Sequence, residues 1–267
     1  MTDAELLDAL ADLAVEAGEA IMAVYGSDFA VDAKSDASPV TRADLEGERI
    51  ILAGLARLAP EIPVIAEEAT TAGAECSVAE RFFLVDPLDG TREFVSKNGE
   101  FTVNIALIEK GEPILGVVLA PALGRLYVGG RGRGARRIDL ADGRTARAIT
   151  VRETPSGGLV VVGSRSHGNA ETDAWLKKIA VAEFRAAGSS LKFCLLAEGL
   201  ADVYPRLGRT MEWDTAAGDA VLRAAGGIVL GLDGAPLTYG KRRQASDVDF
   251  ANPHFVAWAN GPSPEAA

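Results

Sequence analysis

The spacing of the apolar residues changes near residue 150, and this change constrains the fold more than any other feature of the chain. From Thr102 to Val128 the apolar residues alternate as they do in β-strands, for example at Val103, Ile105 and Leu107. Beyond residue 150 the pattern instead predicts strands and helices in turn, which favours an α/β second half. The strands are expected at 159–163, 182–186, 201–204, 227–230 and 255–259, and the helices at 171–180, 190–199 and 213–225.

The first half should combine helices with strands. Apolar residues at spacings of three and four predict a helix over 3–24, which Thr2 and Glu5 begin as a capping box. The other expected elements are a helix over 41–58, strands at 62–65 and 81–85, and a hairpin or loop over 131–150. We therefore predict an α+β chain with an N-terminal subdomain, 1–150, a C-terminal α/β subdomain, 151–260, and a disordered tail, 261–267.

The composition excludes several classes of protein. The 267 residues include 27 Lys and Arg against 38 Asp and Glu, a formal net charge of −11. Binding to a nucleic-acid polymer needs a basic surface, so that class is not expected. No apolar run reaches the roughly 18 residues of a membrane-spanning helix, and the N-terminus lacks the basic region of a signal peptide. The sequence thus predicts a cytoplasmic protein without integral membrane contact.

The two cysteines do not define a site. Cys76 and Cys194 cannot form a disulfide framework, and their spacing is not that of a zinc site. Cys194 lies within an apolar run and is expected to be a buried, unreactive side chain.

A cluster of carboxylates is predicted at the segment Asp86-Pro-Leu-Asp-Gly-Thr91, which directly follows an apolar run. Its proline favours an extended backbone and its glycine permits a turn, so Asp86, Asp89 and the Leu88 carbonyl can converge. Glu67 also follows an apolar run and could join them. Such a cluster repels itself unless a hard divalent cation binds there. Because Asp-Pro and Asp-Gly are common in turns, a plain turn is the alternative interpretation.

Two more acidic residues have both a structural and a functional interpretation. Asp214 precedes a predicted helix in Glu212-Trp-Asp-Thr-Ala-Ala-Gly218, where it could be the N-cap or a metal ligand. Thr41 and Asp44 fit a capping box, and this does not exclude a catalytic role for Asp44.

Three motifs together resemble the inositol monophosphatase superfamily: Glu67-Glu68, Asp86–Thr91 and Trp213-Asp-Thr-Ala-Ala-Gly218. The resemblance extends from the N-terminal helix to Phe255. It implies a layered αβαβα sandwich of the inositol monophosphatase and sugar phosphatase type. Members of this superfamily are magnesium-dependent, lithium-sensitive phosphatases, and the resemblance implies a magnesium-dependent phosphatase with two or three Mg²⁺ ions.

The resemblance assigns the metal ligands. Glu67, Asp86 and the Leu88 carbonyl would hold a first Mg²⁺, and Asp86, Asp89 and Asp214 would hold a second. A third, looser ion would lie near Glu67.

The resemblance also assigns catalytic and phosphate-binding roles. Thr91, paired with Asp44, would take part in activating the attacking water, with Glu67 as a further catalytic residue. The backbone amides of Gly90 and Thr91 would hold phosphate oxygens. The acidic side chains expected also to contact the substrate are Asp89 and Asp214.

Four further segments are similar to the 3′(2′),5′-bisphosphate nucleotidases of this superfamily: Lys34–Asp44, Gly163–His167, Gly188–Phe193 and Tyr204–Arg206. That branch removes the 3′-phosphate of 3′-phosphoadenosine 5′-phosphate and leaves AMP and phosphate. The substrate-binding residues expected from these segments are Ser164, His167, Gly188, Ser189, Lys192 and Arg206.

The choice of substrate also has a physical basis. Inositol monophosphatases tend to carry an apolar residue at the position of Lys192 and an acid near Arg206. Here both residues are cationic, which suits a second phosphate. The alternatives are solvated surface charges for these two residues and a loop cap for His167.

Other functions stay open at the level of sequence. The nearest is the same chemistry on inositol monophosphate or fructose 1,6-bisphosphate, and one from another class is a non-catalytic regulator that binds nucleotide or metal. Both a monomer and a homodimer are compatible with the sequence, as is peripheral attachment to the inner face of the cell membrane.

Overall fold

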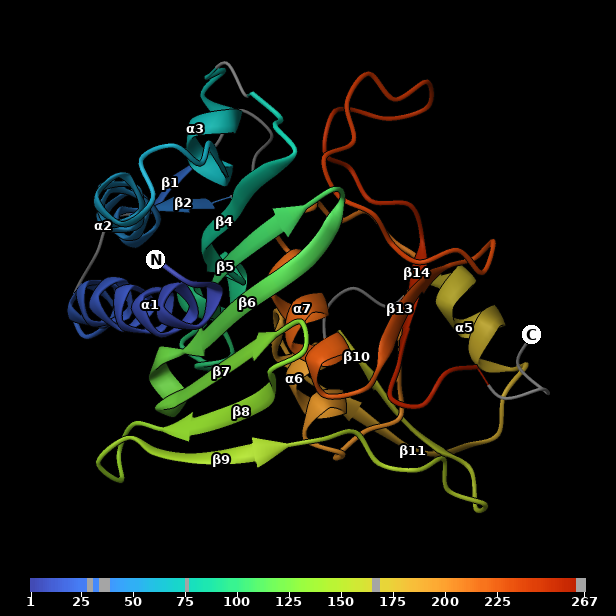
Figure 1. The fold of residues 1–267 in the computed structure, drawn as a ribbon. Helices are drawn as coiled ribbons and strands as arrows, with labels where there is room; N and C mark the ends of the chain where they lie inside the picture. The colour runs from blue at the N-terminus through green and yellow to red at the C-terminus, as the bar shows by residue number, and fades with distance from the viewer. Residues whose placement is uncertain (28–30, 34–38, 75–76, 165–168, 263–267) are drawn as a thin grey trace.

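Two large β-sheets and the helices around them form the computed structural model, which describes residues 1–27, 31–33, 39–74, 77–164 and 169–262 (Figure 1). The helices are α1 (Asp3–Tyr25), α2 (Arg42–Leu58), α3 (Glu67–Thr71), α4 (Thr91–Val95), α5 (Ala170–Leu176), α6 (Leu191–Ala197) and α7 (Ala216–Ala224), with a 3₁₀ turn η1 (Pro121–Leu123). A short antiparallel pair, β1 (Val31–Ala33) and β2 (Pro39–Thr41), precedes α2.

The larger sheet has seven strands in the order β3-β4-β5-β6-β7-β8-β9. They are β3 (Val64–Ala66), β4 (Arg81–Asp89), β5 (Thr102–Glu109), β6 (Glu112–Ala120), β7 (Arg125–Gly130), β8 (Gly134–Asp139) and β9 (Thr145–Ile149). Only the β3–β4 pair is parallel among them. The run Phe82–Val85 of β4 is continuously apolar because helices cover both faces of the sheet at this strand.

Helices α1 and α2 pack on one face of this sheet. The buried side of α1 recurs at helical spacing, as at Leu6, Leu10 and Ala17. The predicted capping box is confirmed, since the Glu5 carboxylate accepts from the Thr2 N–H at 2.7 Å and the Thr2 hydroxyl accepts from the Glu5 N–H at 3.3 Å.

Helices α6 and α7 cover the opposite face and separate it from a five-stranded sheet (Figure 1). This second sheet has the order β11-β10-β12-β14-β13, with β10 (Leu159–Gly163), β11 (Val181–Ala186), β12 (Val203–Arg206), β13 (Ile228–Gly231) and β14 (Phe255–Trp258). Helix α5 packs on its outer face, where Trp175 meets Trp258 edge-on with ring centroids 5.9 Å apart. The five layers confirm the predicted αβαβα sandwich.

The ends of short elements differ from the sequence prediction. The helix expected over 213–225 begins only at Ala216, the one expected over 171–180 ends at Leu176, and the strand expected at 201–204 lies at Val203–Arg206. Residues 131–150 form the β8–β9 hairpin. Cys194 is buried and free, as expected. The predictions for residues 34–38, Cys76 and most of the tail fall outside the described residues.

Helix α7 lies unusually close to the large sheet because glycines face it. Gly116 of β6 and Gly129 of β7 are paired across the two strands. A Cβ atom added to Gly116 would lie 2.4 Å from the Ala217 carbonyl oxygen, and one on Gly129 would lie 2.7 Å from the Cα of Val221. Larger side chains would push away the helix that begins beside Asp214.

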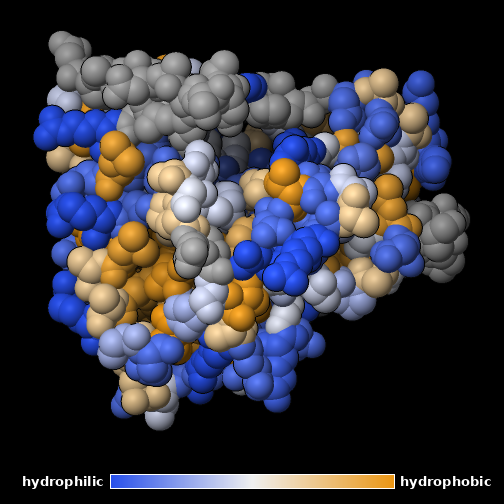
Figure 2. Space-filling model, turned by 90° about the horizontal axis from the view of Figure 1, so that it is seen from above, coloured by the Kyte–Doolittle hydropathy of each residue, from blue (hydrophilic) through white to orange (hydrophobic). Residues whose placement is uncertain are grey.

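The outer surface is mixed in character. On the face seen in Figure 2, hydrophilic side chains cover most of the area and hydrophobic ones gather in smaller patches. Within the described part of the chain, none of the helices combines the length and the apolar character needed to cross a membrane.

Candidate active site

The carboxylates of the first motif lie at one end of β4. This strand does not stop at Val85 but continues to Asp89, with an irregular register between Asp86 and Asp89. Asp86 is buried, and its Oδ1 accepts a hydrogen bond of 3.0 Å from the Leu88 N–H. This local bond, of a kind that Asp also makes in turns, orients the Asp86 carboxylate although the strand continues through the segment.

Parallel pairing brings the third carboxylate to the same place. Ala66, the last residue of β3, is opposite Val85 of β4. The residues that follow, Glu67 and Asp86, consequently lie side by side at the end where β3 stops.

One pocket of about 320 Å³ unites most of the predicted site residues. Those that line it are Glu67, Asp86, Leu88, Asp89, Gly90, Thr91, Ser164, Ser189, Lys192, Arg206 and Asp214. Asp44 is buried on α2 and Gly188 is buried before α6, and neither lines the pocket. His167 lies outside the described residues.

Sequence reasoning missed several residues of this pocket. Tyr204, Phe193 and Thr210 also line it. Tyr204 is two residues before Arg206 on β12, so the alternation of side chains along a strand could have placed both on one face. Nothing in the local sequence marks Thr210.

The pocket carboxylates destabilise one another's ionised forms. Burial raises the pKa of Asp86 well above its usual value, and Glu67 and Asp89 raise it further; Asp44 adds a smaller effect. Burial likewise raises the pKa of Asp214, with Asp89 next in effect. The pKa of Asp89 is raised by burial to about 6, although the Lys192 ammonium opposes this rise. Excess negative charge of this kind favours a bound cation.

The donor set fits Mg²⁺, which prefers oxygen ligands. The pocket is lined by Leu88 and by five carboxylate residues: Glu67, Asp86, Asp89, Glu93 and Asp214. No three His, Cys, Asp or Glu side chains among the described residues, however, lie in a geometry that could hold a metal ion as they stand. The second ion, for which the resemblance names Asp86, Asp89 and Asp214, would therefore require its ligands to rotate toward it.

Two predicted cationic residues, Lys192 and Arg206, line the same pocket. Lys192 is only 6% exposed, and its Nζ donates to the Ser189 carbonyl at 2.7 Å. Burial lowers the pKa of Lys192 to about 8, while Asp89 raises it. Arg206 donates to the Arg209 carbonyl at 2.9 Å, but its buried Nε has no hydrogen-bond partner among the described residues. A solvated surface charge is thus the wrong interpretation for Lys192.

The loop before α6 locks onto the end of β4. The Ser189 hydroxyl donates to the carbonyls of Asp89, at 2.7 Å, and Glu100, at 3.0 Å. The Gly188 N–H donates to the Glu100 carboxylate at 3.0 Å. Gly90 has a φ of +92°, and a Cβ there would lie 2.2 Å from the Ser189 Oγ. Only glycine fits this conformation and contact, as the sequence predicted for the turn.

Asp214 does not cap α7. The N-cap is Thr215, whose side chain makes no capping bond, while the Asp214 Oδ2 accepts from the Met211 N–H at 2.9 Å. The Ser190 hydroxyl donates to the Asp214 carbonyl at 2.8 Å. The carboxylate is thereby held at the pocket rather than at the helix axis.

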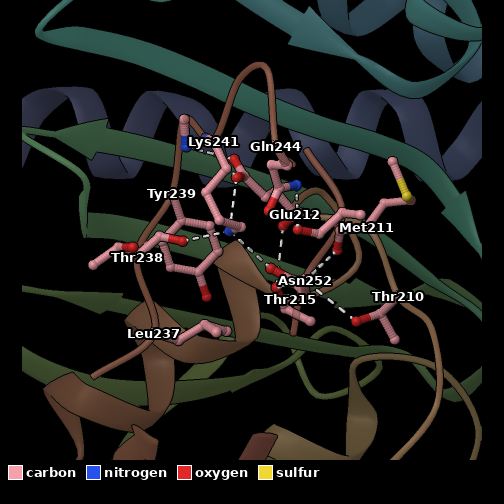
Figure 3. Close-up of polar contacts among 12 residues, drawn as sticks. Thr210, Met211, Glu212, Thr215, Leu237, Thr238, Tyr239, Lys241, Gln244 and Asn252 are labelled. Carbon is pink, nitrogen blue, oxygen red and sulfur yellow. Dashed lines mark hydrogen bonds and ion pairs between the residues drawn. The ribbon is translucent and has the colours of Figure 1, made fainter. Parts of the chain in front are cut away.

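A buried polar network fixes the segment that carries Asp214 (Figure 3). The Oε1 of Glu212, which is fully buried, accepts from both the backbone N–H and the Nζ of Lys241 at 2.8 Å. The Nδ2 of Asn252 donates to the Met211 carbonyl at 2.7 Å and to the Thr215 hydroxyl at 3.0 Å. The loop 238–252 therefore holds residues 210–215 in place through these hydrogen bonds and this ion pair.

Comparison with known proteins identifies relatives over almost the whole chain. The model of the inositol monophosphatase family matches residues 2–253. A 3′(2′),5′-bisphosphate nucleotidase named CysQ from Shigella flexneri is 46% identical over 252 residues, which cover 94% of this chain and 98% of that protein. The crystal structure of CysQ from Bacteroides thetaiotaomicron, described as a bacterial member of the family, has a TM-score of 0.76 at 36% identity and covers 96% and 98% of the two chains.

An inositol monophosphatase structure from Thermotoga maritima has a TM-score of 0.77 at 26% identity, and the match covers 96% of this chain and 92% of that one. The layered sandwich and the carboxylate pocket thus define a protein of the metal-dependent phosphatase class. The chain belongs to the inositol monophosphatase family. Phosphatases of this family generally use Mg²⁺, and the resemblance stated from the sequence is confirmed.

Proposed function

We propose that this chain is a Mg²⁺-dependent 3′(2′),5′-bisphosphate nucleotidase that converts 3′-phosphoadenosine 5′-phosphate to AMP and phosphate. The observation that carries this proposal is the buried Lys192, which lines the same pocket as the four carboxylates proposed as metal ligands. A substrate with one phosphate at the carboxylates and a second phosphate at the cations matches this arrangement. The full-length likeness to proteins named CysQ supports the same substrate.

The metal-binding roles proposed here follow the sequence expectation. Glu67, Asp86 and the Leu88 carbonyl would hold one Mg²⁺, Asp86, Asp89 and Asp214 a second, and a third would lie near Glu67. When bound, Mg²⁺ lowers the pKa of a water molecule and neutralises charge on the phosphate.

The protein's own groups orient the reactants and move the proton. The Thr91 hydroxyl, which lines the pocket, would accept a proton from the attacking water as its own proton passes to the carboxylate of Asp44. The backbone amides of Gly90 and Thr91 would bind the phosphate oxygens in line with this water. The displaced ribose oxygen would take a proton from a solvent water and leave as the 3′-hydroxyl. No phosphoenzyme is expected, because the motifs place no Cys or His nucleophile beside the carboxylates.

Binding of the rest of the substrate falls to the second half of the chain. Lys192 and Arg206 would hold the 5′-phosphate, the latter through its Nε, for which the described part of the chain supplies no hydrogen-bond partner. The remaining residues expected at the substrate are Ser164, His167, Gly188 and Ser189. Gly188 lies behind the pocket wall, so its contribution would be to hold Ser189 in place.

A panel of phosphate esters tests the proposal. Phosphate release should be fastest with 3′-phosphoadenosine 5′-phosphate, slower with inositol monophosphate and fructose 1,6-bisphosphate, and lost in EDTA. Asp89→Asn should abolish the Mg²⁺-dependent release and leave the circular dichroism spectrum unchanged. Preference for inositol monophosphate would reassign the substrate, and nucleotide binding without turnover would make the chain a regulator.

Two further expectations accompany the proposed function. A cytoplasmic location, or peripheral attachment to the inner face of the cell membrane, stays a prediction of the sequence. The same holds for the choice between monomer and homodimer, which sedimentation at several concentrations would measure.

A further inference from the structure

Two polar residues of β5, Thr102 and Asn104, lie beside the pocket carboxylates without lining the pocket. In the antiparallel β4–β5 pair, Asn104 is opposite Asp86 and Thr102 is opposite Asp89. Side chains opposite each other in such a pair project from the same face, with Cβ atoms roughly 4.5–5.5 Å apart. Each of these polar side chains is therefore the direct neighbour of one proposed metal ligand.

Both side chains are buried without hydrogen bonds. Thr102 is 0% and Asn104 is 1% exposed. The Thr102 Oγ1 and both side-chain polar atoms of Asn104 have no hydrogen-bond partner among the described residues. Burying a polar atom without a partner destabilises a fold, and native structures rarely keep such atoms. Three of them on two adjacent positions of one face therefore need an explanation.

Packing alone does not provide that explanation. Ala106 and Ile108 continue the same face of β5 and belong to the apolar core that reaches α6 and α7. Apolar side chains of the size of Thr102 and Asn104 would fill this space without uncompensated loss of hydration. The polar atoms are thus costly where only packing is required, and they adjoin the residues where chemistry is expected.

We propose that Thr102 and Asn104 are positioning residues that hydrogen-bond Asp89 and Asp86 when these carboxylates rotate into their cation-binding arrangement. The inference rests on the proposed metal ligands. As they stand, the three carboxylates proposed for the second ion do not form an ion-binding group. The Oδ1 of Asp86 is already bonded to the Leu88 N–H, so the Asn104 Nδ2 would donate to the other oxygen. The Thr102 hydroxyl would donate to Asp89 in the same way, and ligands held like this bind metal more tightly.

The test combines stability without metal and affinity for metal, because the two should change in opposite directions. Thr102→Val and Asn104→Leu remove the polar atoms at nearly constant size. In EDTA both variants should melt at or above the wild-type temperature. In calorimetric titrations with Mg²⁺ alone they should bind about ten-fold or more weakly. The Mg²⁺ concentration that gives half-maximal phosphate release should rise by a similar factor.

Two controls separate positioning from packing. Thr102→Ser retains the hydroxyl and should keep Mg²⁺ affinity near that of the wild type. Thr145→Val, on the exposed strand β9 of the same sheet, should change neither quantity. Unchanged Mg²⁺ affinity in Thr102→Val and Asn104→Leu, or lower melting temperatures in EDTA, would overturn the inference. A wild-type protein that binds Mg²⁺ but hydrolyses no nucleotide would instead refute the proposed function.

Discussion

Lys192 shows how strongly its surroundings change the chemistry of a single residue. In the first turn of a short helix a lysine is ordinarily solvated, yet this ammonium is buried and bonded to the Ser189 carbonyl. It also lies 5.3 Å from the centre of the Tyr204 ring. A charge held in so little water attracts a phosphate more strongly than a solvated one does. Recognition of the second phosphate is therefore expected to depend on it.

Replacing Lys192 or Arg206, two of the three cationic residues that line the pocket, should affect bisphosphates selectively. In Lys192→Met and Arg206→Met, we expect KM for 3′-phosphoadenosine 5′-phosphate to rise at least ten-fold, because each variant removes a charge-assisted bond. KM for a nucleoside 3′-monophosphate, which has no 5′-phosphate, should change little. Steady-state kinetics with both substrates measures the difference, and equal effects on the two would contradict a role at the second phosphate.

At this scale the sequence identified the acidic residues but not their polar neighbours. Glu67, Asp86 and Asp214 were found because each is close to an apolar run or a helix start, which is local information. Thr102 and Asn104 look like ordinary strand residues until the register of β4 and β5 is known. Register depends on pairing between distant segments, so no local pattern could have identified them.

Among the elements, the segment 210–215 depends on a loop that follows it by more than twenty residues. Its Glu212 is buried with two backbone donors, from Gly240 and Lys241, as well as the Lys241 ammonium (Figure 3). The ends of such short segments are set by partners of this kind rather than by helix propensity. This is why the predicted helix over 213–225 begins late, at Ala216.

Lys241→Met should destabilise the protein because it leaves the Glu212 charge buried without its cationic partner. Breaking a buried pair in this way costs about 3 kcal/mol, so the melting temperature should fall by several degrees. The matched control is Lys110→Met, since Lys110 pairs with Glu80 at the surface, where both side chains are about 70% exposed. Thermal unfolding of both variants tests this role of Lys241. Equal falls in melting temperature in the two variants would argue against it.

For the whole molecule, α7 is the helix that lies between the two sheets and begins beside the site. It packs against the glycine pair of β6 and β7 on one side, and its Gly218 lies under the Phe193 ring of α6. The helix begins directly after Asp214 and Thr215, so its depth in the core sets how far Asp214 reaches into the pocket. The layer order was predictable from the resemblance, but this close approach was not, because it requires glycines on strands distant in sequence.

Gly116→Ala should therefore change stability and activity together. The new Cβ would overlap the Ala217 carbonyl, and overpacking of this kind costs about 1–3 kcal/mol. If α7 shifts outward to relieve this overlap, Asp214 should move out of the pocket and kcat should fall. Gly157→Ala is the control, because nothing lies within 4 Å of its added Cβ and its φ is not positive. Denaturant unfolding measures the stability and phosphate release measures kcat. A destabilised variant with normal kcat would show that the position of α7 does not control the active site.

The proposed metal ligands come from three distant parts of the chain. Only the folded protein brings them together, so cation binding should stabilise the whole fold. Burial and the neighbouring acids raise the folded-state pKa of Asp86, which means that its ionised form destabilises the fold near neutral pH. Asp86→Asn removes that charge and should raise the melting temperature in EDTA. In the wild type, Mg²⁺ at 100 times its Kd should add about 2.7 kcal/mol of stability. The variant should lose most of this gain, and an equal Mg²⁺-induced rise in melting temperature in both proteins would mean that Asp86 does not bind the ion.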